Sequence, residues 1–258
     1  MHKKKIKILI FIITYQASYR VKKVFEDIPF DKLKNFNAKV LLSDDNSKDD
    51  TFEYINKLNH KYKNIFINKN YINLGYGAHI KKSLNFAINK KFDYAIMIHG
   101  DGQYSPKYIP LMIKNFINDV NDKSHLIAVT GSRLHRGIQN VKKGGMPLYK
   151  MIGNLFLTYL YNLLFRTNFT DAHTGLWAYN LNLLKDLKFN KLTDTFNFDQ
   201  EFRFYSNIKN LKIKEIFIKT KYGDERSQLH IIYALRFLFK SFIFFLIKKK
   251  ILTNKQFL

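Results

Sequence analysis

The chain has 258 residues, of which 46% are hydrophobic and 16% aromatic, so it is long and apolar enough to bury a full globular core. Its 44 Lys and Arg residues outnumber its 20 Asp and Glu residues, and the net charge of +24 predicts polyanionic partners: nucleic acid, anionic lipid or a phosphorylated substrate. The absence of cysteine excludes disulfides and thiolate metal sites.

The first apolar run, Ile6–Ile13, follows a basic start and has two interpretations. Basic residues before a short apolar stretch are typical of a signal peptide. The run is rich in β-branched residues, however, and no convincing small-residue cleavage site follows it. We therefore expect a buried strand.

Strand-like and helix-like patterns alternate over the first 130 residues. The strand-like runs are 6–13, 38–43, 64–67, 94–98 and 126–130. This β-α-β-α order predicts an α/β fold with a mainly parallel, Rossmann-like sheet and helices on both faces. Ligands of such sheets bind beyond the carboxyl ends of the strands, where we expect the polar loops 14–18, 44–50, 73–77 and 99–104.

The fourth strand-like run ends in His99-Gly-Asp-Gly-Gln103. A carboxylate flanked by glycines at the rim of a sheet suits a divalent cation that holds a diphosphate. The alternative is a plain turn, since Asp and Gly commonly follow a strand.

Two strongly apolar helical patterns occupy the second half of the chain. The pattern over 146–165 is typical of a helix that is either buried or rests on a membrane. The tail Leu229–Ile247 is slightly too short to cross a bilayer and carries cations on one stripe. We expect a main domain over 1–228 and a C-terminal amphipathic helix over 229–258, lying in the membrane interface or packed on its own domain.

Several motifs, in order along the chain, together resemble the family 2 glycosyltransferases. They are Ile13-Thr-Tyr15, Leu42-Ser-Asp-Asp-Asn-Ser-Lys-Asp-Asp-Thr51, Asn73-Leu-Gly-Tyr-Gly77, 99–103, Gly131-Ser-Arg133, Thr170-Asp-Ala-His-Thr-Gly-Leu-Trp-Ala-Tyr179 and Phe198-Asp-Gln-Glu201. The chain looks most like the branch of dolichol-phosphate mannose synthase and its bacterial polyprenyl-phosphate relatives. The resemblance implies an A-type glycosyltransferase fold, a nucleotide-sugar donor and a divalent cation, Mn²⁺ or Mg²⁺.

The resemblance assigns the donor side of the site to four segments. Thr14, Tyr15, Asp44 and Asp45 would bind the nucleotide, Gly75 and Gly77 would approach the diphosphate with backbone N–H groups, and Asp101 and Gln103 would bind the cation. A capping turn is the alternative for the two aspartates, and a tight turn for the glycines. The family commonly has Asp-x-Asp where this chain has His99-Gly-Asp101, so His99 either stays outside the metal shell or favours manganese.

The acceptor side follows from the later motifs. The resemblance places Arg133 and Lys150 at the acceptor phosphate and Asp171 and Thr174 near the sugar or acceptor. Asp199 and Glu201 occupy the region where relatives that use a hydroxyl acceptor keep a catalytic base; the alternative is an acidic helix N-terminus. We expect Trp177 to be a core residue.

These residues predict an inverting hexosyltransferase of the cell envelope, with Asp101, Asp199 and Glu201 as its catalytic residues, that transfers a sugar to a polyprenyl phosphate. It would be peripheral at the cytoplasmic face of an anionic membrane. One alternative keeps the fold and transfers the sugar to a glycan or lipid hydroxyl. A non-enzymatic nucleic-acid-binding module is a distant alternative, because no nucleic-acid motif accompanies the charge. We therefore expect no nucleic-acid partner.

Overall fold

The structure of the chain is a computed structural model that describes residues 5–122, 125–134, 141, 144–220, 239, 242, 243, 246 and 247, without the side chains of 120–122. The chain forms two compact units. Unit 1 consists of Met1–Gly131 and Gly175–Ile216, and unit 2 of Ser132–Thr174 and Phe217–Leu258. The predicted boundary between 228 and 229 lies outside the described residues, as does most of the predicted C-terminal helix.

A sheet with strand order β3-β2-β1-β4-β6-β5-β7 forms the centre of unit 1. Its strands are β1 (Lys7–Thr14), β2 (Asn37–Asp44), β3 (Ile65–Lys69), β4 (Tyr94–His99), β5 (Leu126–Ser132), β6 (Trp177–Asn180) and β7 (Lys212–Phe217). The pairs β1–β2, β1–β4 and β2–β3 are parallel, whereas β6 runs antiparallel to both β4 and β5. The predicted α/β fold with a mainly parallel sheet is confirmed.

The first apolar run is the central strand of this sheet. Every residue from Ile8 to Thr14 in β1 is buried, and the strand has a parallel neighbour on each side. A strand covered on both faces reads as a continuous apolar run, which explains its likeness to a signal sequence. The strand interpretation of this run is therefore confirmed.

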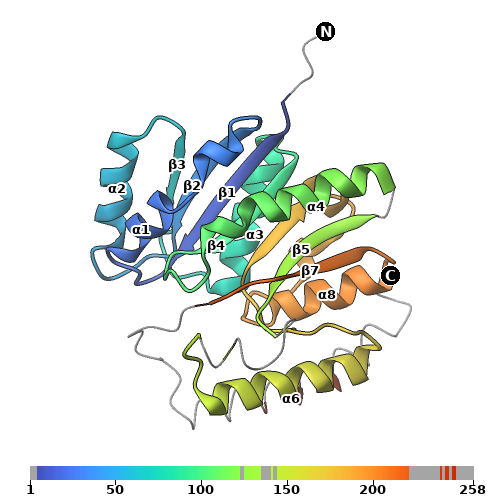
Figure 1. Cartoon of the computed structure of the whole chain (residues 1–258). Coiled ribbons are helices and arrows are strands. Elements are labelled where there is room, and N and C mark those ends of the chain that lie inside the picture. Colours follow the sequence, from blue (N-terminus) through green and yellow to red (C-terminus); the bar gives the residue numbers. More distant parts are fainter. Residues whose placement is uncertain are drawn as a thin grey trace. The chain divides into compact units, whose positions relative to one another are not determined.

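Helices cover both faces of the sheet (Figure 1). The helices of this unit are α1 (Arg20–Glu26), α2 (Thr51–Lys61), α3 (Tyr76–Asn89), α4 (Ile109–Asp122), α7 (Leu181–Leu184) and α8 (Phe198–Ile208), with 3₁₀ turns η1 (Phe30–Leu33), η2 (Pro106–Tyr108) and η3 (Phe189–Lys191); α6 (Leu148–Phe165) belongs to unit 2. Ala95 of β4 belongs to the core that α3 and α8 cover, whereas the ring of Tyr94, the preceding residue, stacks on Phe116 of α4. Successive side chains of a strand point to opposite faces, so α4 lies opposite α3 and α8.

Unit 2 contains α6, which has one buried and one exposed side. Met151 packs with Val141 and Met146 in a small apolar core. The opposite side is the exposed apolar face of α6, which consists of Leu148, Ile152, Phe156, Tyr159 and Leu163, each between 55% and 65% exposed. None of the described helices is both long enough and apolar enough to span a membrane.

Candidate active site

The carboxyl ends of β1, β2 and β4 place three of the predicted polar loops at one edge of the sheet. The register pairs Thr14 with Asp44 and Ile13 with His99, so the three strands end at the same level. The loops 14–18, 44–50 and 99–104 therefore start side by side, at the edge where parallel α/β sheets bind their ligands.

Asp44 holds two of these loops together. Its carboxylate is fully buried and accepts hydrogen bonds from the backbone N–H of Ser47 (3.0 Å) and the hydroxyl of Thr14 (3.3 Å). The Ser47 hydroxyl in turn accepts from the backbone N–H of Gln16 (2.8 Å). Tyr15, between Thr14 and Gln16, remains 47% exposed. The binding of a nucleotide by Thr14, Tyr15 and Asp44 stays a prediction, and the described role of Asp44 is to shape the loop that carries Tyr15.

Asp45 does the same for the loop before α3. It is 4% exposed, and its carboxylate accepts from the Asn70 amide (2.7 Å) and from the backbone N–H groups of Leu74 (2.9 Å) and Gly75 (3.0 Å). Since both oxygens are occupied, the described role of Asp45 is to position this loop, and its binding of a nucleotide stays a prediction.

Backbone conformation and packing explain why glycines occupy positions 75 and 77 of the 73–77 loop. Gly75 has a φ of +84°, which favours glycine, and a Cβ on Gly77 would lie 2.5 Å from the carbonyl oxygen of Thr193. Their N–H groups already donate, that of Gly75 to Asp45 and that of Gly77 to the carbonyl of Asp194 (2.8 Å). The tight-turn interpretation accounts for both residues, and diphosphate binding by these two amides requires the present acceptors to move away.

Asp101 lies in the loop that follows β4, beside the loop that follows β1. A Cβ on Gly100 would lie 2.4 Å from the Cγ2 of Thr14, so the missing side chain lets the two loops pack closely. Asp101 is half-buried, and its Oδ1 accepts the backbone N–H of Gln103 at 2.9 Å. The turn orients the carboxylate and leaves part of its surface accessible to a ligand.

His99 is packed among aromatic side chains. Its ring lies edge-on to those of Tyr76 (5.7 Å between centroids) and Tyr104 (5.4 Å). Its Nε2 is buried and has no hydrogen-bond partner within the part of the chain that the structure describes. A Cβ on Gly175 would lie 2.7 Å from this Nε2. Burial lowers the pKa of His99, against the charge of Asp101, and so favours the neutral imidazole; whether this histidine joins the metal shell stays a prediction.

The residue types at this turn fit a cation that shares its ligands with a substrate. Asp101 has a carboxylate and Gln103 an amide oxygen, both hard oxygens, and the binding of a cation by Gln103 stays a prediction. Within the described residues, no group of three or more His, Cys, Asp and Glu side chains is placed to enclose a metal ion. Mg²⁺ typically binds through one or two carboxylates plus substrate phosphates, and this loop suits that arrangement.

Asp199 lies in the first turn of α8 and faces α3. It is 5% exposed, and the Tyr76 hydroxyl donates to its Oδ2 at 2.9 Å. Burial raises the pKa of Asp199 to about 7, although the Tyr76 hydrogen bond, the Arg203 guanidinium and the Trp177 indole act to lower it. A carboxyl group with a pKa near neutrality is suited to proton transfer, and a buried structural acid shows the same shift.

Glu201, in the same turn, has a structural contact. It is 2% exposed, and its Oε2 accepts the backbone N–H of Thr193 at 2.5 Å. This contact ties the start of α8 to the segment that covers Gly77. The catalytic roles of Asp199 and Glu201 both stay predictions.

Arg203 is a buried charge that the sequence analysis missed. It is fully buried, its guanidinium carbon lies 4.5 Å from the centre of the Trp177 ring, and its Nη2 donates to the Thr130 hydroxyl at 3.4 Å. Arg203 follows Asp199 by four residues, a spacing that brings two side chains together on a helix. This spacing is the feature of the sequence from which the pair could have been predicted. The core position expected for Trp177 is confirmed.

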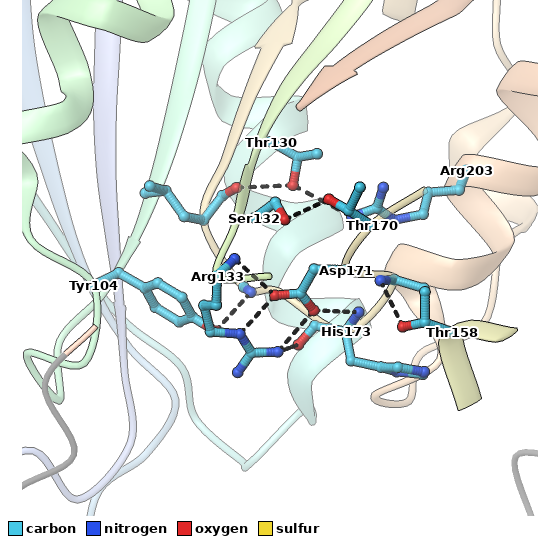
Figure 2. Close-up of polar contacts among 12 residues, drawn as sticks. Tyr104, Thr130, Ser132, Arg133, Thr158, Thr170, Asp171, His173 and Arg203 are labelled. Carbon is cyan, nitrogen blue, oxygen red and sulfur yellow. Dashed lines mark hydrogen bonds and ion pairs between the residues drawn. The ribbon is translucent and has the colours of Figure 1, made fainter. Parts of the chain in front are cut away.

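In unit 2, the Arg133 side chain is paired with Asp171 (Figure 2). Its Nε and Nη2 donate to the two Asp171 oxygens at 2.7 and 2.8 Å, and Nη2 also donates to the carbonyl of His173 at 2.9 Å. Burial acts to raise the pKa of Asp171, but Arg133 outweighs it and holds this pKa at about 2.

The four residues predicted at the acceptor all belong to this unit. Thr174 is buried, and Lys150 is half-buried on α6. Since Arg133 is engaged by Asp171 and His173, a phosphate would meet a guanidinium that is already oriented. The acceptor role of all four residues stays a prediction.

Comparisons with known proteins show which sequences and folds the chain is similar to. The family model described as glycosyl transferase family 2 matches residues 9–188. A UDP-N-acetylglucosamine–dolichyl-phosphate N-acetylglucosaminyltransferase of Methanococcus voltae is 29% identical over 230 residues, covering 84% of this chain and 87% of that protein. An uncharacterised protein of Methanocaldococcus jannaschii is 29% identical over 222 residues, covering 83% and 88%.

Solved structures share the fold at low sequence identity. Glucosyl-3-phosphoglycerate synthase from Mycobacterium tuberculosis, in complex with Mn²⁺, UDP and phosphoglyceric acid, has a TM-score of 0.62 and 13% identity, covering 94% of this chain and 78% of that one. A mannosyltransferase from Pyrobaculum calidifontis, in complex with GDP-Man and Mn²⁺, has a TM-score of 0.58 and 9% identity, covering 96% and 70%. The predicted A-type glycosyltransferase fold is confirmed. Because the family model matches well over half of the sequence, this chain belongs to glycosyl transferase family 2 and is a glycosyltransferase.

Proposed function

We propose that this glycosyltransferase moves a sugar from a nucleotide-sugar donor to a polyprenyl phosphate, with inversion at the anomeric carbon. The observation that carries the donor half is the half-buried Asp101 in a loop packed against the loop of Thr14 and Tyr15, at the carboxyl edge of the sheet. The name and the extent of similarity of the Methanococcus voltae relative support a nucleotide-sugar donor and a lipid-phosphate acceptor.

On the donor side, the chain supplies loops that are held in place by buried carboxylates. Asp44 and Asp45 fix the loops that would receive the nucleotide, and Tyr15 offers an exposed ring for its base. A divalent cation at Asp101 and Gln103 would supply positive charge to the departing nucleoside diphosphate. The fixed loops reduce the reorganisation needed when that charge develops.

On the acceptor side, Arg133 and Lys150 would hold the phosphate. One acceptor phosphate oxygen attacks the anomeric carbon from the face opposite the nucleotide. A new carbon–oxygen bond forms as the bond to the nucleoside diphosphate breaks, and the electron pair leaves with the diphosphate. The acceptor phosphate is largely ionised at neutral pH, so this attack needs no strong base.

The exposed apolar face of α6 supports a location of the enzyme at a membrane surface. Five large apolar side chains stand more than half exposed along one side of this helix. The net charge of +24 favours an anionic surface, and a lipid-linked acceptor is presented at one. We place the enzyme as a peripheral protein at the cytoplasmic face, in cell-envelope synthesis, with the catalytic domain over 1–228 and the tail over 229–258 as a further membrane contact.

The test is a transfer assay with the purified full chain. Radiolabelled UDP- and GDP-sugars are incubated singly with undecaprenyl or dolichyl phosphate and Mn²⁺, and the organic phase is counted. We expect label in the lipid fraction with one donor, and Arg133→Ala is expected to raise the KM for the lipid at least tenfold. Failure to label either lipid with any donor would overturn the lipid-phosphate acceptor.

One observation favours a second candidate, transfer to a glycan or lipid hydroxyl. A hydroxyl nucleophile needs a base, and burial brings the pKa of Asp199 to about 7, near the optimum for such a base at neutral pH. The variants Asp199→Asn and Arg133→Ala separate the candidates. Loss of turnover only in the first favours a hydroxyl acceptor, whereas loss only in the second favours the phosphate.

A further inference from the structure

The hydrogen bond between Tyr76 and Asp199 joins two parts of unit 1 that are far apart in sequence. Tyr76 is the first residue of α3 and belongs to the glycine-rich loop 73–77, whereas Asp199 is in the first turn of α8. The Tyr76 hydroxyl donates to the Asp199 Oδ2 at 2.9 Å, and the carboxyl group is nearly fully buried. One donor therefore links the loop expected at the nucleotide to the acid expected at the acceptor.

The Tyr76 ring contacts two other rings. The ring of Phe196 stacks on it at 5.4 Å with an angle of 21°, and His99 contacts it edge-on at 5.7 Å. The neighbouring Gly77 donates its N–H to the Asp194 carbonyl, and Lys81, one turn further along α3, forms an ion pair with the Asp194 side chain at 2.6 Å. The hydroxyl is therefore presented to Asp199 by a braced ring, so its direction is fixed before any substrate binds.

We propose that Tyr76 is a positioning residue for Asp199: its hydroxyl holds the Asp199 carboxyl group in place, favours its ionised form and couples it to the donor-side loop. The contribution of this coupling to turnover rests on the second candidate of the proposed function, in which Asp199 is the base for a hydroxyl acceptor. The effect of Tyr76 on Asp199 itself does not.

The groups around Asp199 make its charge state sensitive to this one donor. Tyr76 approaches from α3, Trp177 and Tyr179 from β6, and Arg203 from α8 itself. Tyr76, Arg203 and Trp177 favour the ionised form, against the burial that disfavours it. Burial and the charge of Asp199 raise the pKa of Tyr76 well above its usual value, so its hydroxyl keeps its proton at neutral pH and acts as the donor.

The variant Tyr76→Phe removes the hydroxyl that donates to Asp199 and keeps the ring that contacts Phe196 and His99. A hydrogen bond to a charged group stabilises it enough to move its pKa by about one to two units. We therefore expect the pKa of Asp199 to rise by that amount, measured by ¹³C NMR of the carboxyl carbons in ¹³C-Asp-labelled protein. The Asp199 resonance is assigned by its absence from Asp199→Asn. The control is Tyr71→Phe, which removes a hydroxyl from a side chain that is 99% exposed.

Activity gives the second readout. In Tyr76→Phe the acidic limb of the kcat/KM profile should move to higher pH by the same one to two units, and Tyr76→Phe should add nothing in the Asp199→Asn background. An unchanged Asp199 titration in Tyr76→Phe overturns the proposal, whether or not the enzyme transfers to lipid. An altered titration with an unaltered rate profile overturns the coupling to turnover and leaves the lipid-acceptor assay to decide the function.

Discussion

At the scale of single residues, Gly175 is explained by the histidine that faces it. A Cβ at this position would lie 2.7 Å from both Cε1 and Nε2 of His99 and 3.2 Å from the Tyr104 ring. We predict that Gly175→Ala lowers the free energy of unfolding by about 1–3 kcal/mol, the usual cost of overpacking a core. Chemical denaturation measures the change. In a His99→Ala background the cost should largely disappear, and an equal cost in both backgrounds would contradict the contact.

Asp199 should also make the free energy of unfolding depend on pH. Its folded pKa, about 7, lies above the unfolded value near ~3.9, so its protonated form is favoured by folding. The stability that this difference contributes is fully present below pH ~4 and is lost as the pH rises towards 7. We predict that the unfolding free energy of the wild type, relative to Asp199→Asn, falls by roughly 2–4 kcal/mol between pH 4 and 7.5. Denaturant titrations at several pH values test this, and a constant difference would contradict it.

At the scale of elements, the exposed face of α6 makes the membrane proposal measurable. Phe156 and Leu163 are 55% and 62% exposed, so replacing both with Gln removes apolar surface without opening a cavity. We predict that Phe156→Gln/Leu163→Gln reduces co-sedimentation with anionic vesicles severalfold and leaves the melting temperature nearly unchanged. The control is Leu111→Gln, because Leu111 of α4 is 43% exposed. Equal binding by the double variant and the wild type would remove this helix from the membrane contact.

The elements also show where sequence patterns succeed and where they fail. Apolar runs predicted the five strands β1 to β5, most clearly β1, because a strand buried on both faces is apolar throughout. The strands β6 and β7 were not predicted; β6 has four residues and inserts antiparallel between β4 and β5. Its place depends on tertiary pairing, which one local pattern does not encode.

The sequence likewise predicted some features of the candidate site and not others. The motifs identified Asp44, Asp45 and Asp101 as residues at the sheet edge, because they lie at or just after the ends of strands. They did not reveal that Asp45 binds the loop before α3, that Asp194 caps Gly77, or that Tyr76 holds Asp199. Each of these contacts joins segments that only the folded chain brings together.

At the scale of the whole molecule, the central claim is that Asp101 serves a cation-dependent nucleotide site. The most direct measurement is calorimetric titration of the full chain with UDP and with GDP, each with and without Mn²⁺. We predict Mn²⁺-dependent binding of one nucleotide, at least tenfold weaker in Asp101→Asn and unchanged in Asp186→Asn, a surface acid-to-amide control. Equal affinity of the wild type and Asp101→Asn for that nucleotide in the presence of Mn²⁺ would contradict the account.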